Sequence, residues 1–289
     1  MARVRLIINA DDLGLHPAVR RAVEECAARG TVTSASVLAN GPDLAAVRPV
    51  AGVSMGAHLN ILRGAPLSPA REVRSLVGDD GRFVGSWSRL AWRAVRGALD
   101  LGEVRLEWSR QVARLRDHGL DPSHLDGEKH TQCLPGLLGI ACEVASEHGI
   151  PFVRRSHERW GTPFPAGGAT GFLRRAVLST LCERAPRTNG ARAADAVWGI
   201  AEQGRALRAS RCARALREAA GVVEVVCHPG RVHEGDPGMP ESFGRMRVAR
   251  LWEPELRSLL EDPWLETARA EGWSLVGFDA LVKDGHAAT

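Results

Sequence analysis

Residues that can bind metals or transfer protons follow four strand-like segments of this chain. They are the doublet Asp11-Asp12, His58, the segment from His124 to His130, and His228. Carboxylate oxygens and imidazole nitrogens are common ligands of zinc and related divalent ions, and both groups act as general acids and bases. If the four segments meet in space, metal-assisted chemistry is the reaction class that their residue types indicate.

The Asp11-Asp12 doublet has two interpretations when it is taken alone. Two carboxylates crowded in apolar surroundings are costly unless a cation or a proton relieves them. A divalent metal would bind one of them and leave the other as a base. In the alternative, Asp12 caps the following helix and Asp11 is solvated. The doublet by itself does not choose between these interpretations.

His58, in GAHLN, and the segment SHLDGEKH supply imidazoles. A lone histidine after an apolar strand is more often a hydrogen-bonded core residue than a ligand, and SHLDGEKH alone is compatible with a solvated turn. One aspartate and two histidines from separate strand ends nevertheless match a catalytic metal site with open positions for water and substrate. We expect Asp126 to orient a ligand imidazole, and His130 is a further candidate for a residue of the site.

His228 lies in VCHPG, directly after the most β-rich run of the chain. The Pro-Gly pair that follows predicts a stiff turn. An imidazole changes charge near neutral pH, so His228 is a candidate general acid. The alternative is that its ring only satisfies a buried turn. Arg154 and Trp160 are predicted to contribute to the walls of the site.

The elements that must position these residues alternate between strand and helix, which favours parallel β-α units. Strands are predicted at residues 4–10, 33–39, 53–59, 122–126, 151–154, 221–230 and 274–280. Helices are predicted at 17–29, 43–50, 88–99, 103–118, 137–148, 171–184, 203–219 and 253–270. We interpret residues 1–289 as a single α/β domain, an irregular (β/α) barrel of the TIM type with about seven or eight parallel strands. Active sites of such barrels lie at the carboxyl ends of the strands. An open doubly wound sheet is the second choice.

Composition narrows the class of protein. The chain has 289 residues, of which 44% are hydrophobic and 25% charged, and 38 basic against 34 acidic residues give a net charge of +4. These values are typical of globular proteins and give no support for a nucleic-acid partner. No segment has the length and apolarity of a membrane span or a signal peptide. Six cysteines without a C-x-x-C pair suggest free thiols in a reducing compartment, so we expect a cytoplasmic protein.

In sequence order, INADDLGLHPAV, GTVTSASVLANGP, GAHLN, HLDGEKHTQCLPG and VVCHPG resemble segments of the YdjC-like carbohydrate deacetylase family. This family includes chitooligosaccharide deacetylases and a hopanoid-biosynthesis-associated branch. The matching segments extend from the first predicted strand to residue 230. The resemblance implies an irregular barrel and one divalent metal, magnesium or zinc. It also implies hydrolysis of the N-acetyl group of an amino sugar in an oligosaccharide or glycoconjugate.

The resemblance also implies roles for individual residues. By motif position Asp12, His58 and His124 would bind the metal, Asp11 would be the general base that takes a proton from the metal-activated water, and His228 would be the acid beside the site. In one respect the chain departs from the family, whose third segment often reads H-x-D-x-H-x-H-x-H. Glu128 and Gln132 replace two of those histidines. The residues predicted to contact substrate or to support the ligands are Asp126, Glu128, His130, Arg154 and Trp160.

Three other classes of protein remain open at this stage. A metal-dependent sugar isomerase usually needs more carboxylate ligands and a catalytic lysine, but Lys129 and Lys283 are the only lysines. A phosphoesterase needs two metals and more ligands. A non-catalytic sugar-binding protein needs no metal. A homodimer is compatible with the sequence.

Overall fold

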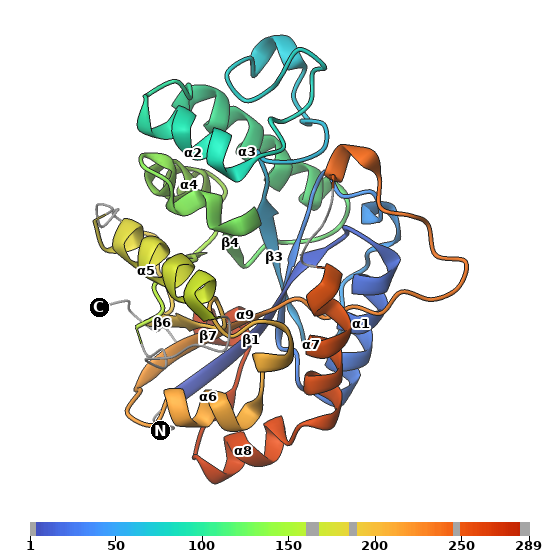
Figure 1. Cartoon of the computed structure of the whole chain (residues 1–289), viewed down its shortest axis with the longest axis vertical. Coiled ribbons are helices and arrows are strands. Elements are labelled where there is room, and N and C mark those ends of the chain that lie inside the picture. The colour runs from blue at the N-terminus through green and yellow to red at the C-terminus, as the bar shows by residue number, and fades with distance from the viewer. Residues whose placement is uncertain (1–3, 160–167, 185–189, 245–248, 284–289) are drawn as a thin grey trace.

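A computed structural model describes residues 4–159, 168–184, 190–244 and 249–283 of the chain. Its strands form one parallel sheet in the order β5-β4-β3-β2-β1-β7-β6, with β8 beside β1 (Figure 1). This sheet curves into a half-barrel with flanking helices, which confirms the predicted α/β barrel class. The strands are β1 (Val4–Leu13), β2 (Ser34–Val37), β3 (Ser54–Leu59), β4 (His124–Gly127), β5 (Phe152–Val153), β6 (Ala196–Trp198), β7 (Gly221–Cys227) and β8 (Ser274–Leu275).

Helices cover both sides of the sheet. In Figure 1, α1 and α7 lie side by side on one side, and α3, α4 and α5 lie on the other. The helices are α1 (Pro17–Arg29), α2 (Trp87–Val95), α3 (Leu101–Asp117), α4 (Leu137–Glu147), α5 (Gly168–Arg184), α6 (Ala209–Ala215), α7 (Ala249–Glu261), α8 (Trp264–Ala270) and α9 (Phe278–Lys283).

The two outer strands of the sheet, β5 and β6, approach each other through neighbouring residues. Phe152 of β5 forms a parallel bridge with Arg192, four residues before β6. The amide of Val197 in β6 donates to the carbonyl of His157 at 3.0 Å. The sheet therefore turns towards closure at this edge, as expected for an irregular barrel.

Local sequence explains the first β-α unit. β1 and β7 are almost entirely buried, which suits parallel strands covered on both sides. His16 caps the N-terminus of α1, where its Nδ1 accepts from the Ala18 amide, and Pro17 is the first residue of the helix. It ends at Gly30, whose φ of 79° is accessible to glycine at little cost. The apolar face of α1 then packs against the sheet.

A bulge near the end of β1 changes the direction of its side chains. The pairing with β2 runs from Ala10 opposite Ala35 to Leu13 opposite Val37, so β1 contains one extra residue. Within this bulge Asp12 adopts a φ of 68°, in the left-handed region that a non-glycine residue rarely occupies. Asp11 and Asp12 consequently line the same cavity, although neighbours on a regular strand face opposite ways.

Some predicted elements differ from those observed. The predicted helix at 253–270 is two helices, α7 and α8, because Pro263 between them lacks an amide donor. The predicted strand at 274–280 is reduced to Ser274–Leu275, and α9 follows it. The predicted helix at 43–50 is a single turn, Leu44–Ala46, and that at 203–219 is α6 with a turn before it. Strand β6 was not predicted.

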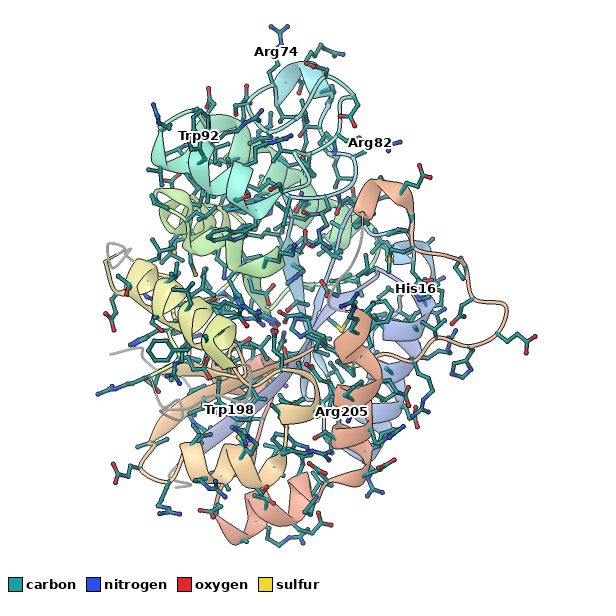
Figure 2. The ribbon with its side chains drawn as sticks, in the orientation of Figure 1. His16, Arg74, Arg82, Trp92, Trp198 and Arg205 are labelled. Atoms are coloured by element: carbon teal, nitrogen blue, oxygen red, sulfur yellow. The ribbon has the colours of Figure 1, made fainter. Side chains whose placement is uncertain are left out.

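The outer surface of α2 exposes apolar side chains, and Trp92, labelled in Figure 2, is 57% exposed.

Over the described residues, every helix is too short or too polar to cross a bilayer.

Candidate active site

A cavity of about 780 Å³ lies at the carboxyl ends of β1, β3 and β7. Six of the residues predicted from sequence line it, namely Asp11, Asp12, His58, Glu128, His130 and His228. Its other walls come from Arg63, Trp87, Lys129, Arg250, Leu251 and residues of α5. The structure therefore brings together side chains from each of the four segments that were singled out by residue type.

Asp11 is fixed by Arg154. The Arg154 Nη1 and Nη2 atoms donate to the two carboxylate oxygens of Asp11 at 2.8 and 2.7 Å. The Asn9 side-chain amide donates to Oδ1 at 2.8 Å. Burial disfavours the charge, but the adjacent guanidinium holds the pKa of Asp11 well below its usual value. Asp11 is therefore an ionised, oriented carboxylate of low proton affinity.

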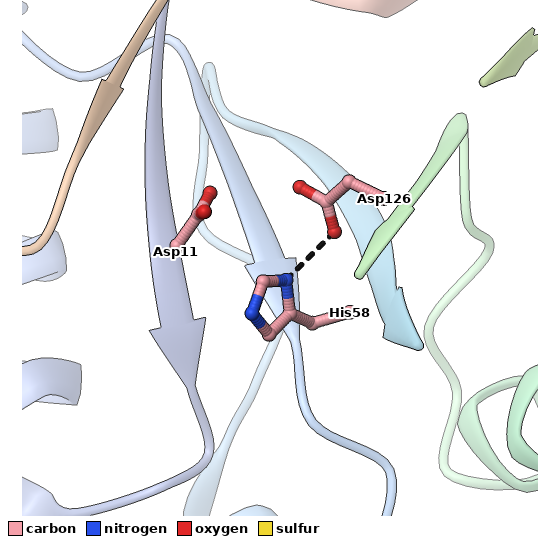
Figure 3. Close-up of side chains that lie close together, drawn as sticks. All are labelled: Asp11, His58 and Asp126. Atoms are coloured by element: carbon pink, nitrogen blue, oxygen red, sulfur yellow. Dashed lines mark hydrogen bonds and ion pairs between the residues drawn. The ribbon is translucent and has the colours of Figure 1, made fainter. Parts of the chain in front are cut away.

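Asp126 orients the imidazole of His58. His58 Nδ1 lies 2.7 Å from Asp126 Oδ1, and a dashed line marks this contact in Figure 3. The Ser36 hydroxyl donates to Asp126 Oδ2 at 2.7 Å. Burial opposes ionisation of Asp126, but Arg154 and His58 lower its pKa. In this arrangement Nε2 of His58 faces away from Asp126, and the role of Asp126 in supporting a ligand imidazole stays a prediction.

Asp12 lies near Nε2 of His58, the ring nitrogen that faces away from Asp126. Its Oδ1 is 3.4 Å from His58 Nε2, and its side chain is 6% exposed. Burial lowers the pKa of His58, but Asp126 and Asp12 outweigh it and raise that pKa well above its ordinary value. A positive charge is thus favoured between these carboxylates.

Arg154 lies behind the cavity wall, buried among three carboxylates. Its Nη2 is 2.7 Å from Asp126 Oδ2 and 2.6 Å from Glu224 Oε1, in addition to its contacts with Asp11. Burial raises the pKa of Glu224 to about 7. Arg154 does not line the cavity, in contrast to the predicted place in its walls, and its role in supporting the ligands stays a prediction.

His124 does not line the cavity with Asp12 and His58. Its Nε2 lies 3.1 Å from the Ser36 hydroxyl and its Nδ1 lies 3.0 Å from the Ser123 hydroxyl. Its ring also stacks on Phe278 of α9, with the ring centroids 4.1 Å apart. Burial lowers the pKa of His124 to about 4. A role as metal ligand stays a prediction for this residue.

Glu128 presents an unsatisfied carboxylate oxygen at the cavity. Its Oε1 lies 3.0 Å from the Arg63 Nε atom, whereas its Oε2 is buried without a hydrogen-bond partner. Burial raises the pKa of Glu128, and Asp12 adds to this effect. A buried carboxylate oxygen without a partner is costly, so this atom is suited to accept a cation or a donor group.

His228 lies across the cavity and is held by Glu255 of α7. The backbone amide of His228 donates to Glu255 Oε2, and its Nδ1 is 3.6 Å from the same oxygen. Its Nε2 is 4.0 Å from Asp11 Oδ2. Burial lowers the pKa of His228, but Glu255 outweighs it and raises that pKa to about 9. The imidazolium is therefore the dominant form at neutral pH.

The remaining predicted residues differ in position. His130 Nδ1 lies 2.8 Å from the Ser156 hydroxyl, and burial lowers its pKa to about 3. His130 adopts a φ of 57° and Lys129 one of 49°, so this segment is a kinked turn at the cavity. The Gln132 side-chain amide donates to the Arg154 carbonyl and to the Ser156 hydroxyl, both at 3.4 Å. Trp160 lies outside the described residues.

Sequence reasoning missed Ser36, Glu224 and Glu255. Glu224 interrupts the apolar run GVVEVVC, and an isolated acid in a fully buried strand signals a buried cation. Nothing comparable marks Ser36 or Glu255, because their partners lie far away in the sequence.

One group of possible metal ligands stands out within the described part of the chain. Ligand atoms of Asp11, His58 and Asp126 all lie within 4.8 Å of one another, and all three residues are buried. Arg154 already engages both of these carboxylates. The nitrogen of His58 that faces away from Asp126 is directed to Asp12 instead.

Comparison with known proteins identifies the family of the chain and supports its fold. Residues 5–270 match the family model of YdjC-like protein, and the chain belongs to this family. It is 32% identical over 266 residues to a carbohydrate deacetylase of Mus musculus, covering 84% of this chain and 81% of the mouse protein. A carbohydrate deacetylase of Homo sapiens is also 32% identical over 266 residues, covering 84% of this chain and 78% of the human protein.

A solved structure supports the fold. The crystal structure of an Enterococcus faecalis V583 protein named for cellobiose-phosphate cleavage has a TM-score of 0.72 to this chain, with 24% sequence identity. The match covers 97% of this chain and 99% of that protein.

Proposed function

We propose that this protein is a metal-dependent hydrolase that removes the N-acetyl group from an amino sugar. The observation that carries the proposal is that Asp11, Asp12, His58 and His228 line one cavity at the carboxyl ends of parallel strands. Family membership and the names of the mouse and human relatives support a carbohydrate amide as the substrate. We further propose that the enzyme acts in the cytoplasm.

The residues present fit a divalent metal, magnesium or zinc. Asp12 Oδ1 and His58 Nε2 lie 3.4 Å apart, and Asp126 supports the far side of the imidazole. The orphaned Oε2 of Glu128 is the third donor that we propose, in place of His124, whose ring nitrogens both contact serine hydroxyls. The Glu128 side chain would move towards Asp12 and His58 when a metal binds, since the group with ligand atoms within 4.8 Å of one another among the described residues is Asp11, His58 and Asp126. When bound, the metal would supply Lewis-acid polarisation of the acetyl carbonyl and acidify water.

Asp11 acts as general base in this proposal. The clamp by Arg154 keeps the carboxylate ionised and holds it in one orientation. Its low proton affinity restricts it to acidified water, which agrees with a metal-dependent reaction. His228 acts as general acid, because its raised pKa keeps a proton available for the departing sugar nitrogen.

Acetate release from N-acetylglucosaminyl oligosaccharides tests the proposal. We expect Asp11→Asn and His228→Gln each to lower kcat by about 100-fold or more, the usual range for a lost general base or acid. Glu261→Gln is the control, because that side chain is 66% exposed and pairs only loosely with Arg257. Full activity of both variants would overturn the assigned roles.

A further inference from the structure

Two buried thiols meet in the apolar cluster behind the cavity wall, apart from the proposed catalytic groups. The Sγ atoms of Cys133 and Cys182 are 2.8 Å apart, although the residues are separated by 49 positions in the chain. Both are unbonded thiols, and the residues are only 2% and 1% exposed. This separation is shorter than an ordinary contact between two sulfurs, so the side chains are already directed at each other.

The pair connects two parts of the cavity wall. Cys133 ends the Glu128–Cys133 turn, which also carries His130. Cys182 lies in α5, a helix that contributes Arg174 and Leu178 to the wall. Leu178 and the two cysteines belong to the same small apolar cluster. A covalent link here would attach α5 to the turn that carries Glu128.

We propose that Cys133 and Cys182 form a redox-sensitive pair, which a dissolved peroxide oxidises to a disulfide that fastens α5 to the Glu128–Cys133 turn. The proposal concerns a modification site and does not depend on the proposed deacetylase activity.

The surroundings assign different roles to the two sulfurs. The Cys182 thiol donates a hydrogen bond to Cys133 Sγ. Burial opposes ionisation of Cys133, but the hydrogen bonds from Cys182 and Ser156 and the charge of Arg154 lower its pKa. The pKa of Cys182 is raised, first by its hydrogen bond to Cys133 and then by burial. Cys133 is therefore the attacking thiolate and Cys182 the resolving thiol.

The oxidation balances with hydrogen peroxide as the oxidant. Cys133 first loses its thiol proton to solvent. Its thiolate then attacks one peroxide oxygen and the O–O bond breaks, which leaves a sulfenic acid and a hydroxide that takes a proton back from solvent as water. The Cys182 sulfur then attacks the Cys133 sulfur, the S–O bond breaks, and the leaving hydroxide takes the Cys182 proton as water. Two thiols and one peroxide yield one disulfide and two waters.

Peptide mapping of the native 289-residue chain tests the proposal. The folded protein is treated with hydrogen peroxide, quenched in denaturant with an alkylating agent, and digested without reduction. We expect one cross-linked peptide pair containing Cys133 and Cys182, with the other four cysteines alkylated. Alkylation of all six cysteines would overturn the proposal, as would a disulfide that involves any other cysteine or a sulfinic acid at Cys133 without a cross-link.

A second measurement follows the consequence for α5. We expect peroxide to slow amide hydrogen exchange in α5 by at least about 10-fold and to raise the apparent Tm by about 5 °C, both reversed by dithiothreitol. Cys142→Ser is the matched control, since it removes another buried cysteine but keeps the pair, and it should respond like the native chain. Cys182→Ser and Cys182→Ala should lose the response. An equal response in either Cys182 variant would contradict the proposal.

Discussion

Arg154 is the buried cation that holds the acidic groups of the site together. It contacts Asp11, Asp126 and Glu224, all of which are almost fully buried. A buried charge that loses its partner is strongly destabilising, whereas a satisfied network of this kind fixes the geometry of its members. Arg154 therefore affects both the stability of the fold and the orientation of Asp11.

Replacing Arg154 tests this dependence. We expect Arg154→Gln to lower the free energy of unfolding by about 3–5 kcal/mol, because three carboxylates lose their common partner. Urea denaturation measures the change. Arg257→Gln is the control, since its side chain is 57% exposed and its ion pairs lie on the surface, and it should change stability by less than about 0.5 kcal/mol. Equal effects of the two substitutions would contradict the role of Arg154.

Glu255 sets the protonation range of His228. Burial alone would lower the pKa of His228, and Glu255 raises it to about 9. An acid catalyst works below its pKa, so activity should fall as pH rises through about 9. We expect Glu255→Gln to move this alkaline limb of kcat towards neutral pH, measured from about pH 6 to about pH 10. Glu253→Gln, an exposed neighbour on α7, should leave the limb in place. An unchanged limb in Glu255→Gln would show that Glu255 does not control it.

The third metal ligand can be assigned by affinity, without any activity measurement. We expect Glu128→Gln to weaken zinc or magnesium binding by about 10-fold or more, because it removes the carboxylate with a free oxygen. His124→Gln should weaken binding much less. Equilibrium dialysis of each folded variant, checked by circular dichroism, gives the two constants. The reverse order of effects would restore His124 as the ligand.

At the scale of single residues, the sequence predicted those whose chemistry is visible in their type and position. Asp11, Asp12, His58 and His228 each end a strand-like run, and the structure places all four at one cavity. The ligand role of His124 was implied by a motif, and geometry does not bring that ring to Asp12. Glu255 was not predicted, because its contact with His228 spans 27 residues and depends on how α7 packs.

At the scale of elements, the bulge of β1 and a close contact between β3 and β4 determine the site. The bulge turns Asp11 and Asp12 into one cavity. A Cβ atom added at Gly56 would approach the ring of His124 to 2.3 Å, so glycine is required where these strands pack. Strands with long apolar runs could be predicted from sequence. β6 was missed, because its three residues follow the alanine-rich segment ARAAD and show no alternation typical of a strand, whereas the shorter β5 lies within a predicted strand.

A pair of glycine substitutions tests the packing of β3 against β4. We expect Gly56→Ala to lower the free energy of unfolding by about 1–3 kcal/mol, because His124 and the stacked Phe278 must move. Gly139→Ala in α4 is the control, since no atom lies within 4 Å of the added carbon. This control should be neutral or stabilising by up to about 1 kcal/mol. Chemical denaturation measures both changes in the free energy of unfolding. Equal changes in the two variants would contradict the packing contact between β3 and β4.

At the scale of the whole molecule, the α/β class and the parallel sheet were predicted correctly, and the single-domain assignment stays a prediction. Short apolar runs alternate with segments of helical periodicity along the chain, and this pattern is strong enough to predict the fold class. The approach of β5 to β6 depends on contacts of Arg192 and His157, which no local pattern announces. The cavity forms only where β1, β3, β7 and α5 come together, so its shape follows from the complete fold.

Metal binding should be visible in the stability of the whole chain. A ligand that binds only the folded state stabilises it by about 2.7 kcal/mol at 100 times its Kd. We expect saturating zinc or magnesium to raise the Tm of the chelator-treated chain by about 5 °C. Asp12→Asn should lose most of this shift, whereas Asp79→Asn, an exposed carboxylate, should keep it. A shift that is the same in both variants would place the metal elsewhere.

The most direct measurement is acetate release from an N-acetylglucosaminyl oligosaccharide by the metal-loaded chain, the same chain after chelation, and the chelated chain after reloading. The account predicts one acetate per amino group exposed in the first and third samples and at least a 100-fold lower rate in the second. Acetate release that is unaffected by chelation, or no acetate from any metal-loaded sample across a panel of N-acetylated sugars, would contradict it.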